Sequence, residues 1–321
     1  MQLNRRFCVA PMMDRTDRHE RFFLRRLSKF AFLYTEMVHA NAVIRNSGLL
    51  NYDKSEHPLG IQLGGSDPVI LADAAQISEE YGYDEVNLNI GCPSIKVQEG
   101  NFGAVLMKDP LRVANCIHQI VNKIQIPVSI KCRIGIDNMD EDKDLSKFIR
   151  ITHEGGCSIY IIHARKAWLK GLSPEENRNV PPLNYERVYR IKEEFPDLEI
   201  ILNGGITNVR NSLSHLNYVD GVMIGRLAYQ DPFKISEVDK IFYGKKGSKK
   251  KRDKVFKELI PYLIKEKENG TKLHQITRHL MGLFKGINNA KQIRKLLISI
   301  VGHQKLESQL NYISNQLEKR C

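Results

Sequence analysis

One cysteine stands where a thiol could take part in a reaction. Cys92 follows the run Asn87-Leu88-Asn89-Ile90-Gly91, whose alternating polar and apolar residues are typical of the end of a buried strand. Gly91 lets the backbone turn and Pro93 fixes φ just beyond, so we expect Cys92 on a short rigid corner at the C-terminal end of a strand. A buried structural cysteine is the alternative interpretation.

Two carboxamides lead up to this corner. Asn87 and Asn89 fall on the same face of the predicted strand, because strand side chains alternate with a period of two. Each amide offers both a donor and an acceptor, so the pair could hydrogen-bond a flat polar heterocycle such as a nucleobase.

Other predicted strands also end in polar residues. Gln62 lies on the third strand, Lys131 and Arg133 share a face of the fifth, and His163 and Arg165 share a face of the sixth. A cation such as Lys131 beside the pyrimidine edge of a flavin would stabilise the anionic reduced form. An internal ion pair would also explain Lys131, and a hydrogen-bonded core histidine would explain His163.

Glycines follow the last two predicted strands. The seventh ends in Asn203-Gly204-Gly205 and the eighth in Gly225-Arg226, where backbone N–H groups could approach a phosphate closely and Arg226 would add a charge. Together the two turns predict a phosphate site. A phosphate-bearing cofactor held there would lie across Pro11, Met12, Gln62 and Lys131.

The elements that must position these residues repeat along the first three quarters of the chain. Eight short apolar segments alternate with amphipathic helices, a pattern that predicts a (β/α)₈ TIM barrel with its active site at the C-terminal ends of the strands. A doubly wound sheet is the competitor, but it has no need of eight units. The predicted strands run from Phe7 to Met12, Phe32 to Met37, Gly60 to Gly65, Glu85 to Gly91, Val128 to Ile134, Ile159 to Arg165, Ile200 to Gly205 and Gly221 to Arg226. The predicted helices run from Asp17 to Lys29, Val38 to Arg45, Asp67 to Tyr81, Pro110 to Ile124, Asp142 to Glu154, Tyr185 to Phe195 and Asn208 to Leu216.

The connection after the sixth strand is long. Residues 166–182 carry the only tryptophan, Trp168, two basic residues beside it and the helix-start signal Ser173-Pro174-Glu175-Glu176. Extended loops on the catalytic rim usually serve substrate binding.

The basic charge of the chain is concentrated at its C-terminus. Residues 245–321 hold 19 Lys and Arg against 6 Asp and Glu, whereas the first 244 residues hold 30 against 31. We expect a barrel over 1–244, an exposed, mobile basic linker over 245–252 and a small all-helical domain over 253–321. Such a basic appendage favours nucleic acid as partner, although a solvated lysine-rich surface is the alternative. Helices are predicted from Asp253 to Glu268, Lys272 to Lys285, Asn289 to Ile300 and His303 to Lys319.

Composition excludes other classes. No run of eighteen apolar residues and no signal peptide is found in the 321 residues, and the six cysteines have neither metal-ligand nor disulfide spacing. We therefore expect a cytoplasmic protein without a bound metal.

The motifs together resemble those of the tRNA-dihydrouridine synthases, in particular their A-type subfamily. The Asn-x-Gly-Cys-Pro stretch at Cys92 is specific to that family, and the run from His163 to Leu169 with Glu176-Asn177-Arg178 is similar to the A-type signature. The resemblance covers nearly the whole chain. The other matching stretches are Ala10-Pro11-Met12-Met13-Asp14, Tyr34-Thr35-Glu36-Met37, Gln62-Leu63-Gly64-Gly65-Ser66, Lys131-Cys132-Arg133-Ile134-Gly135, Asn203-Gly204-Gly205 and Gly225-Arg226.

This resemblance implies a flavin barrel with a helical tRNA-binding domain, in which FMN and NADPH reduce the C5–C6 bond of D-loop uridines at positions 20 and 20a. Cys92 is implied as the proton donor and Asn89 as a contact to the target nucleotide. No obligate protein partner is evident, and we expect a monomer. The FMN-binding residues implied are Pro11, Met12, Met13, Gln62, Lys131, His163, Asn203, Gly204, Gly205, Gly225 and Arg226, and the tRNA contacts are Glu175, Arg178, Lys291 and Arg294.

The chemistry of the residues agrees with this expectation. Hydride would reach C6 of uracil and C5 would take a proton from the opposite face. A free thiol has a pKa of about 8.5 and is mostly protonated at neutral pH, so an acid role needs no lowered pKa. The target uridine must turn out of the folded tRNA. Lys291 and Arg294 are three residues apart and would share a helix face, where they could grip phosphates or simply be solvated.

Two other functions remain open at this level. A flavin oxidoreductase of free pyrimidines would share the barrel, Lys131 and Cys92 but would leave the basic helices unexplained. A non-enzymatic RNA-binding protein would explain the charge but not the phosphate site.

Overall fold

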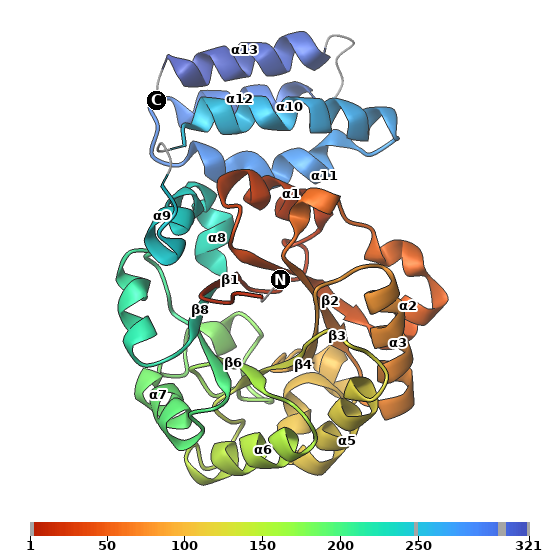
Figure 1. The fold of residues 1–321 in the computed structure, drawn as a ribbon. Coiled ribbons are helices and arrows are strands. Elements are labelled where there is room, and N and C mark those ends of the chain that lie inside the picture. Colours follow the sequence, from red (N-terminus) through yellow and green to blue (C-terminus); the bar gives the residue numbers. More distant parts are fainter. Residues whose placement is uncertain (1–2, 247–249, 301–305, 320–321) are drawn as a thin grey trace.

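The barrel predicted from the sequence is confirmed. A computed structural model describes residues 3–246, 250–300 and 306–319, and in it eight parallel strands pair in chain order and close, β8 pairing with β1 (Figure 1). The strands are β1 Phe7–Val9, β2 Phe32–His39, β3 Leu59–Gly64, β4 Glu85–Ile90, β5 Val128–Arg133, β6 Ile159–His163, β7 Glu199–Asn203 and β8 Gly221–Ile224.

Several strands end before their predicted limits. Pro11 has no N–H to donate, so β1 stops at Val9 rather than Met12. β7 stops at Asn203 because Gly204 takes a φ of +111°, which no extended strand has. The polar residues that follow these strands therefore lie in turns at the barrel mouth.

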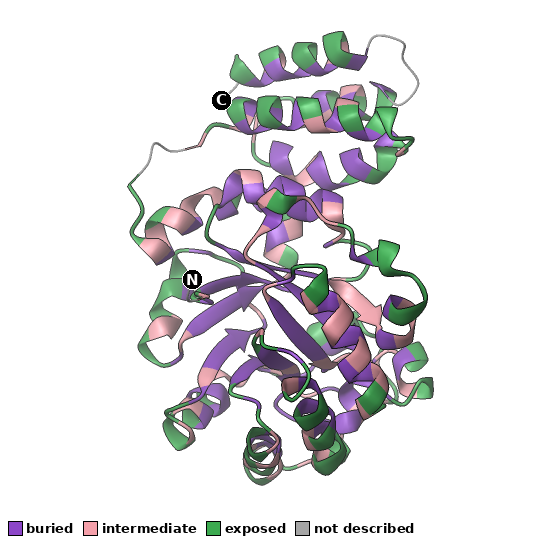
Figure 2. Cartoon of the chain, turned by 45° about the vertical axis from the view of Figure 1, so that its right-hand side comes forward, coloured by how far each residue is buried: buried purple, intermediate pink, exposed green. Residues whose placement is uncertain are grey.

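Helices surround the barrel, with buried strands inside and exposed faces outward (Figure 2). The predicted helix at 38–45 begins only at Ala40, because Val38 and His39 continue β2. The predicted helix at 208–216 is a 3₁₀-helix, η5 (Asn211–Asn217), since the Asn208 side chain accepts from the backbone N–H groups of Arg210 and Asn211 and starts a tighter turn. The main outer helices are α1 Arg18–Leu27, α2 Ala40–Arg45, α3 Pro68–Glu80, α5 Pro110–Val121, α6 Lys143–Glu154 and α7 Tyr185–Glu194.

Short helical segments that were not predicted shape the loops. They are η1 Ser47–Leu50, η2 Lys54–Glu56, α4 Ile95–Glu99, η3 Gly103–Lys108, η4 Glu176–Arg178, α8 Arg226–Gln230, η6 Pro232–Glu237 and α9 Val238–Tyr243. Of these, α4, η3, η4 and α8 lie on the connections that leave the C-terminal ends of the strands.

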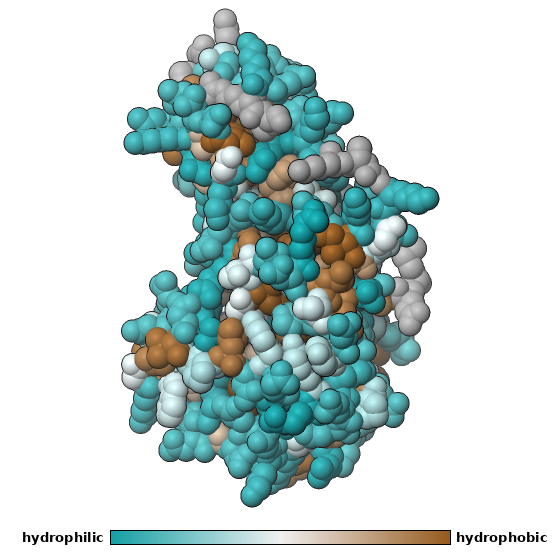
Figure 3. Space-filling view, turned by 90° about the vertical axis from the view of Figure 1, so that its left-hand side faces the viewer, coloured by the Kyte–Doolittle hydropathy of each residue, from teal (hydrophilic) through white to brown (hydrophobic). Residues whose placement is uncertain are grey.

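The basic C-terminal region is helical, as expected, and its outer surface is mostly hydrophilic (Figure 3). Its segments are α10 Arg252–Glu268, α11 Leu273–Thr277, η7 Arg278–Phe284, α12 Ala290–Ser299 and α13 Leu306–Glu318. The single helix predicted over 272–285 is wrong, because α11 passes directly into the 3₁₀ segment η7. Residues 303–305 of the last predicted helix lie outside the described residues.

The predicted linker is shorter than expected. Arg252 already belongs to α10, and Lys250 is half-buried, with its ammonium group hydrogen-bonded to the carbonyl oxygen of Arg26. Residues 247–249 lie outside the described residues, so their predicted exposure and mobility are not described.

The C-terminal helices pack on α1 of the barrel (Figure 1). Arg18 pairs with Glu266 at 2.6 Å and Asp17 with His279 at 2.9 Å. Phe22 stacks on Tyr262, with ring centroids 3.8 Å apart. The basic helices are therefore fixed beside the β1 side of the barrel. No helix in the described part of the chain is long and apolar enough to cross a membrane.

Candidate active site

The Cys92 corner forms as the sequence predicts. The Oδ1 atom of Asn89, near the end of β4, accepts hydrogen bonds from the backbone N–H groups of Gly91 at 3.1 Å and Cys92 at 3.0 Å. Cys92 is partly exposed, and its Sγ atom lies 3.6 Å from Oγ of Ser94. The other cysteines in the described residues are buried, so the interpretation of Cys92 as a buried structural cysteine does not hold.

The start of η3 also holds the backbone of the Cys92 corner. The N–H of Ala104 donates to the carbonyl oxygen of Cys92 at 2.9 Å. Gly103 has a φ of +72°, and a Cβ there would lie 2.7 Å from that same oxygen. Only glycine fits such a close approach without strain. The first residues of η3 therefore fix the backbone that presents the thiol.

The two carboxamides lie at different depths. Asn87 is fully buried, accepting from Gln62 Nε2 at 2.7 Å and donating to Ser129 Oγ at 2.7 Å. Asn89 is partly exposed and donates from Nδ2 to Gln62 Oε1 at 2.8 Å. Only Asn89 is placed to meet a heterocycle at the mouth, while Asn87 and Gln62 support it from inside the barrel.

Lys131, His163 and Asn203 meet across neighbouring strands. Lys131 Nζ donates to Asn203 Oδ1 at 3.0 Å, and Asn203 Nδ2 donates to the Met223 carbonyl oxygen at 2.8 Å. Burial, together with the charge of Arg133, lowers the pKa of Lys131 to about 8. Within the described residues Lys131 forms no ion pair, so the ion-pair interpretation does not hold.

His163 lies among positive charges. Burial lowers its pKa well below the usual value, and the charges of Arg133 and Lys131 lower it further. The imidazole is therefore neutral, able to accept or donate one hydrogen bond at each ring nitrogen. A Cβ at Gly204 would lie 2.5 Å from the Cδ2 atom of His163, so the turn after β7 requires glycine.

Five cations converge near this mouth, and none of them forms an ion pair with a carboxylate among the described residues. Arg226 donates to Asn179 Oδ1 at 2.6 Å, which ties the turn after β8 to the loop after β6. Uncompensated cations beside glycine turns are a donor set that suits a phosphate and the carbonyl oxygens of a heterocycle. The five are Lys131, Arg133, Arg165, Arg178 and Arg226.

The loop after β1 completes the predicted cofactor residues. Pro11 and Met12 are partly exposed and Met13 is exposed. The Sδ atom of Met12 lies 3.7 Å from where a Cβ on Gly225 would stand, so the loop after β1 adjoins the turn after β8. The structure thus brings the predicted cofactor residues to one end of the barrel.

The predicted tRNA contacts do not all lie together. Glu175 and Arg178 are exposed on the loop after β6, on the rim that carries Cys92. Lys291 and Arg294 belong to α12 in the helical region. Lys291 is exposed, but Arg294 is half-buried and donates from Nε to the Met281 carbonyl oxygen at 3.0 Å.

One buried side chain that organises the rim was not predicted. Asn177 is fully buried; its Oδ1 accepts from Trp168 N at 2.8 Å and its Nδ2 donates to the Trp168 carbonyl oxygen at 2.9 Å. These two hydrogen bonds link the two ends of the segment 168–177. The only sequence signal was its place between Glu176 and Arg178 in the matched signature.

Comparison with known proteins agrees with this geometry. Residues 8–318 match the family model described as dihydrouridine synthase. A tRNA-dihydrouridine(20/20a) synthase of Shewanella oneidensis is 49% identical over 296 residues, covering 92% of this chain and 88% of that protein. The proteins of the same name from Synechocystis and from Escherichia coli K12 are 48% and 49% identical, covering 90% and 91% of this chain and 87% and 85% of their own.

Solved structures support the fold. A 2-naphthoyl-CoA reductase complex matches with a TM-score of 0.53 at 10% identity over 74% of this chain. A 6-hydroxypseudooxynicotine amine oxidase matches with a TM-score of 0.54 at 10% identity over 76%. This chain spans about half of each of those two chains, 51% and 48%. At such low identity the likeness concerns the barrel alone.

Proposed function

This chain belongs to the dihydrouridine synthase family, and we propose that it reduces uridines 20 and 20a of tRNA to 5,6-dihydrouridine, with Cys92 as the proton donor. It is an oxidoreductase of that family. One observation carries the catalytic part of the proposal: a partly exposed thiol is held on a rigid corner at the same barrel mouth as Lys131, His163 and the glycine turns.

FMN is the cofactor that the mouth suits best. When bound and reduced by NADPH, it would supply the hydride that C6 of uracil takes up. Arg226 and the turns at Gly204-Gly205 and Gly225 would hold its phosphate, with His163 against the turn. Lys131 would lie by the ring with Gln62 beneath it, and Pro11, Met12 and Met13 would cover its side, while Asn203 orients Lys131.

Cys92 would give its proton to C5 of the same uracil. The proton leaves Sγ for C5 on the face opposite the one that received hydride, and the thiolate regains a proton from solvent. Asn89 fixes the position of Sγ through the N–H of Cys92 and would itself contact the target base. The partial exposure of Cys92 leaves room for a base turned out of the RNA.

The remaining surface would hold the rest of the tRNA. We assign residues 1–244 to the catalytic barrel and the region from Arg252, where α10 begins, to a helical tRNA-binding domain, joined through the short segment between them. The net positive charge of residues 245–321 supports this division, as does the exposure of Lys291. Glu175 and Arg178 would contact the RNA at the rim. On α12, Arg294 would contact the RNA through its terminal guanidinium nitrogens, because its Nε atom already donates to the Met281 carbonyl oxygen. The protein would act as a monomer in the cytoplasm.

The experiment that tests the proposal compares wild type with Cys92→Ala. Both are given unmodified tRNA transcript, FMN and NADPH, and dihydrouridine is mapped at positions 20 and 20a. We expect the variant to stay yellow and to oxidise NADPH but to lose most uridine reduction. Undiminished dihydrouridine formation would overturn the role of Cys92.

The same assay separates the competing functions. Equal activity on uracil or UMP would favour an oxidoreductase of free pyrimidines. A colourless protein that gains no flavin absorbance when FMN is added would favour an RNA-binding protein without enzymatic activity. The exchange of NADPH for NADH in this assay reveals the preferred reductant.

A further inference from the structure

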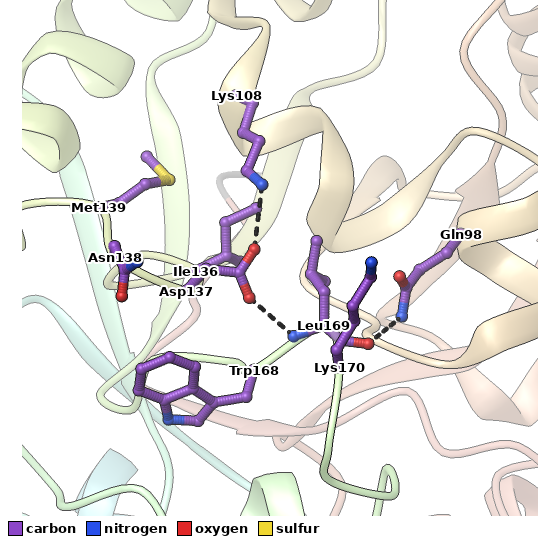
Figure 4. A pocket seen from close by; sticks show the side chains of 9 residues that line it. All are labelled: Gln98, Lys108, Ile136, Asp137, Asn138, Met139, Trp168, Leu169 and Lys170. Carbon is purple, nitrogen blue, oxygen red and sulfur yellow. Dashed lines mark hydrogen bonds and ion pairs between the residues drawn. The ribbon is translucent and has the colours of Figure 1, made fainter.

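A cavity opens on the rim of the barrel next to the Cys92 corner (Figure 4). This cavity, the rim pocket, has a volume of about 540 Å³, which lies in the size range of small-molecule sites. Its walls come from the connections after β4, β5 and β6, so it belongs to the catalytic end of the barrel. Its lining residues are Gln98, Lys108, Ile136, Asp137, Asn138, Met139, Trp168, Leu169 and Lys170.

One side chain joins the rim pocket to the Cys92 corner. The Nε2 atom of Gln98 donates to the Pro93 carbonyl oxygen at 2.8 Å and to the Leu169 carbonyl oxygen at 2.9 Å. Pro93 directly follows Cys92, and Leu169 is part of the pocket wall. A strand whose target base enters beside Cys92 therefore has the rim pocket within reach of its next nucleotide.

Trp168 gives the pocket an aromatic wall. Trp168 is 41% exposed, whereas its backbone N–H and carbonyl groups are both hydrogen-bonded to the Asn177 side chain. The N–H of the preceding residue, Ala167, donates to the Gly135 carbonyl oxygen at 3.0 Å. A large exposed ring on a fixed backbone loses little conformational freedom when a base stacks on it, and every base offers a face for stacking.

The charges of the lining suit one phosphate. Lys108 Nζ pairs with Asp137 Oδ2 at 3.0 Å, and Asp137 Oδ1 accepts from the N–H of Leu169 at 2.9 Å. Lys170 is exposed and forms no ion pair among the described residues. Lys170 is thus the lining cation that keeps its charge uncompensated. One such charge suits the single phosphate of one nucleotide better than the several negative charges of a dinucleotide cofactor such as NADPH.

We propose that the rim pocket binds the nucleotide that flanks the target uridine in the tRNA, with its base stacked on Trp168 and its phosphate facing Lys170. This inference rests on the proposed function and extends it. The relatives carry two adjacent positions, 20 and 20a, in their names. When one of two adjacent uridines is at Cys92, the other would be a natural occupant of the rim pocket.

Because Trp168 is the only tryptophan, its fluorescence reports on the pocket directly. The FMN-loaded protein is titrated with unmodified tRNA, with tRNAs that carry an abasic residue on one or the other side of the target uridine, and separately with NADP⁺. We expect quenching by intact tRNA and its loss with one of the two abasic tRNAs. Quenching by NADP⁺ instead, or equal quenching by all three tRNAs, would overturn the proposal.

Kinetics provide a second, independent readout. Trp168→Ala should raise KM for tRNA about tenfold, in line with the loss of one stacked base, while NADPH oxidation in the absence of tRNA stays unchanged. Trp168→Phe should restore most of the affinity. Tyr218→Ala is the matched control. It removes an exposed ring that lies just ahead of the N-terminal end of β8, at the end of the barrel opposite the rim pocket, and it should leave KM unchanged.

A double comparison separates this inference from the proposed function. Wild type should bind the abasic tRNA that fails to quench Trp168 more weakly than it binds intact tRNA. The Trp168→Ala variant should bind these two tRNAs with equal affinity. If dihydrouridine forms normally but Trp168→Ala still discriminates between those tRNAs, the pocket is assigned wrongly and the function stands. If no tRNA is reduced by wild type, the proposed function itself has failed.

Discussion

The Nε atom of Arg133 donates a hydrogen bond to the carbonyl oxygen of Gly91 over 2.9 Å, which joins β5 to the residue ahead of Cys92. The Nη1 atom of the same side chain donates to the carbonyl oxygens of Lys166 and Asn177, each at 3.0 Å. Arg133 is buried. One guanidinium thus holds the Cys92 corner and the loop after β6 in a fixed relation.

Replacement of this guanidinium should impair both catalysis and stability. Arg133→Lys keeps the charge but cannot reach three carbonyl oxygens in the planar arrangement of arginine. We expect kcat for dihydrouridine formation to fall by about tenfold to a hundredfold, and the free energy of unfolding to fall by about 2 kcal/mol. Single-turnover assays and denaturant unfolding measure the two. Arg190→Lys, at an exposed ion pair on α7, is the control, and an equal loss of activity there would contradict the positioning role.

The depressed pKa of Lys131 predicts a pH dependence of FMN binding. Burial lowers this pKa to about 8, so in the FMN-free protein Lys131 is charged below pH 8 and neutral above it. If the charge of Lys131 attracts the oxygen-bearing pyrimidine edge of the flavin, FMN affinity should fall several-fold as pH rises from 7 to 9. Fluorescence titration of FMN measures this change. Lys131→Arg keeps its charge throughout and should show a flat profile; a slope of equal size in the variant would mean that another group is responsible.

The turn after β7 predicts a strict requirement for glycine. Gly204→Ala places a Cβ 2.5 Å from His163 at a φ of +111°, so it must displace the histidine or the turn. We expect FMN content to fall at least tenfold. Gly171→Ala is the matched control: its φ of +84° carries similar backbone strain, but nothing lies within 4 Å of the new Cβ. It should cost about 1 kcal/mol of stability and retain FMN, as absorbance at saturating cofactor would reveal.

The contact between α1 and the C-terminal helices predicts a loss of stability in mild acid. Burial, together with the charge of Arg18, lowers the pKa of His19 to about 4, and its Nδ1 atom lies 2.7 Å from the hydroxyl of Tyr262. The unfolded chain therefore takes up a proton from about pH 6.5 downward, whereas the folded protein does so only near pH 4. The contribution of His19 to stability is complete above pH 6.5 and is lost as the pH falls toward 4, by at most about 3 kcal/mol. Thermal melts of wild type and His19→Gln across this range should diverge; parallel curves would refute the assignment.

The sequence was sufficient for the barrel and the Cys92 corner because both depend on local rules. Strand alternation, together with Gly91 and Pro93, predicts that the thiol follows a buried strand on a tight turn. The links made by Arg133 and Gln98 could not be predicted, because each joins backbone atoms of different loops whose relative placement arises only on folding. The same reason explains why the hydrogen bond from Arg294 to the Met281 carbonyl oxygen was not predicted.

The amide of Asn89 also determines which kind of base could meet it. Its oxygen already serves two backbone N–H groups, and one of its two N–H bonds points to Gln62. The Asn89 amide therefore keeps one N–H that can still donate a hydrogen bond, and its oxygen has no lone pair left to accept one. A pyrimidine that turns a carbonyl oxygen toward this amide is accepted, and one that turns an exocyclic amine toward it meets a second donor. If Asn89 contacts the target base, as we propose, it would therefore favour the carbonyl edge of uracil over the amino edge of cytosine.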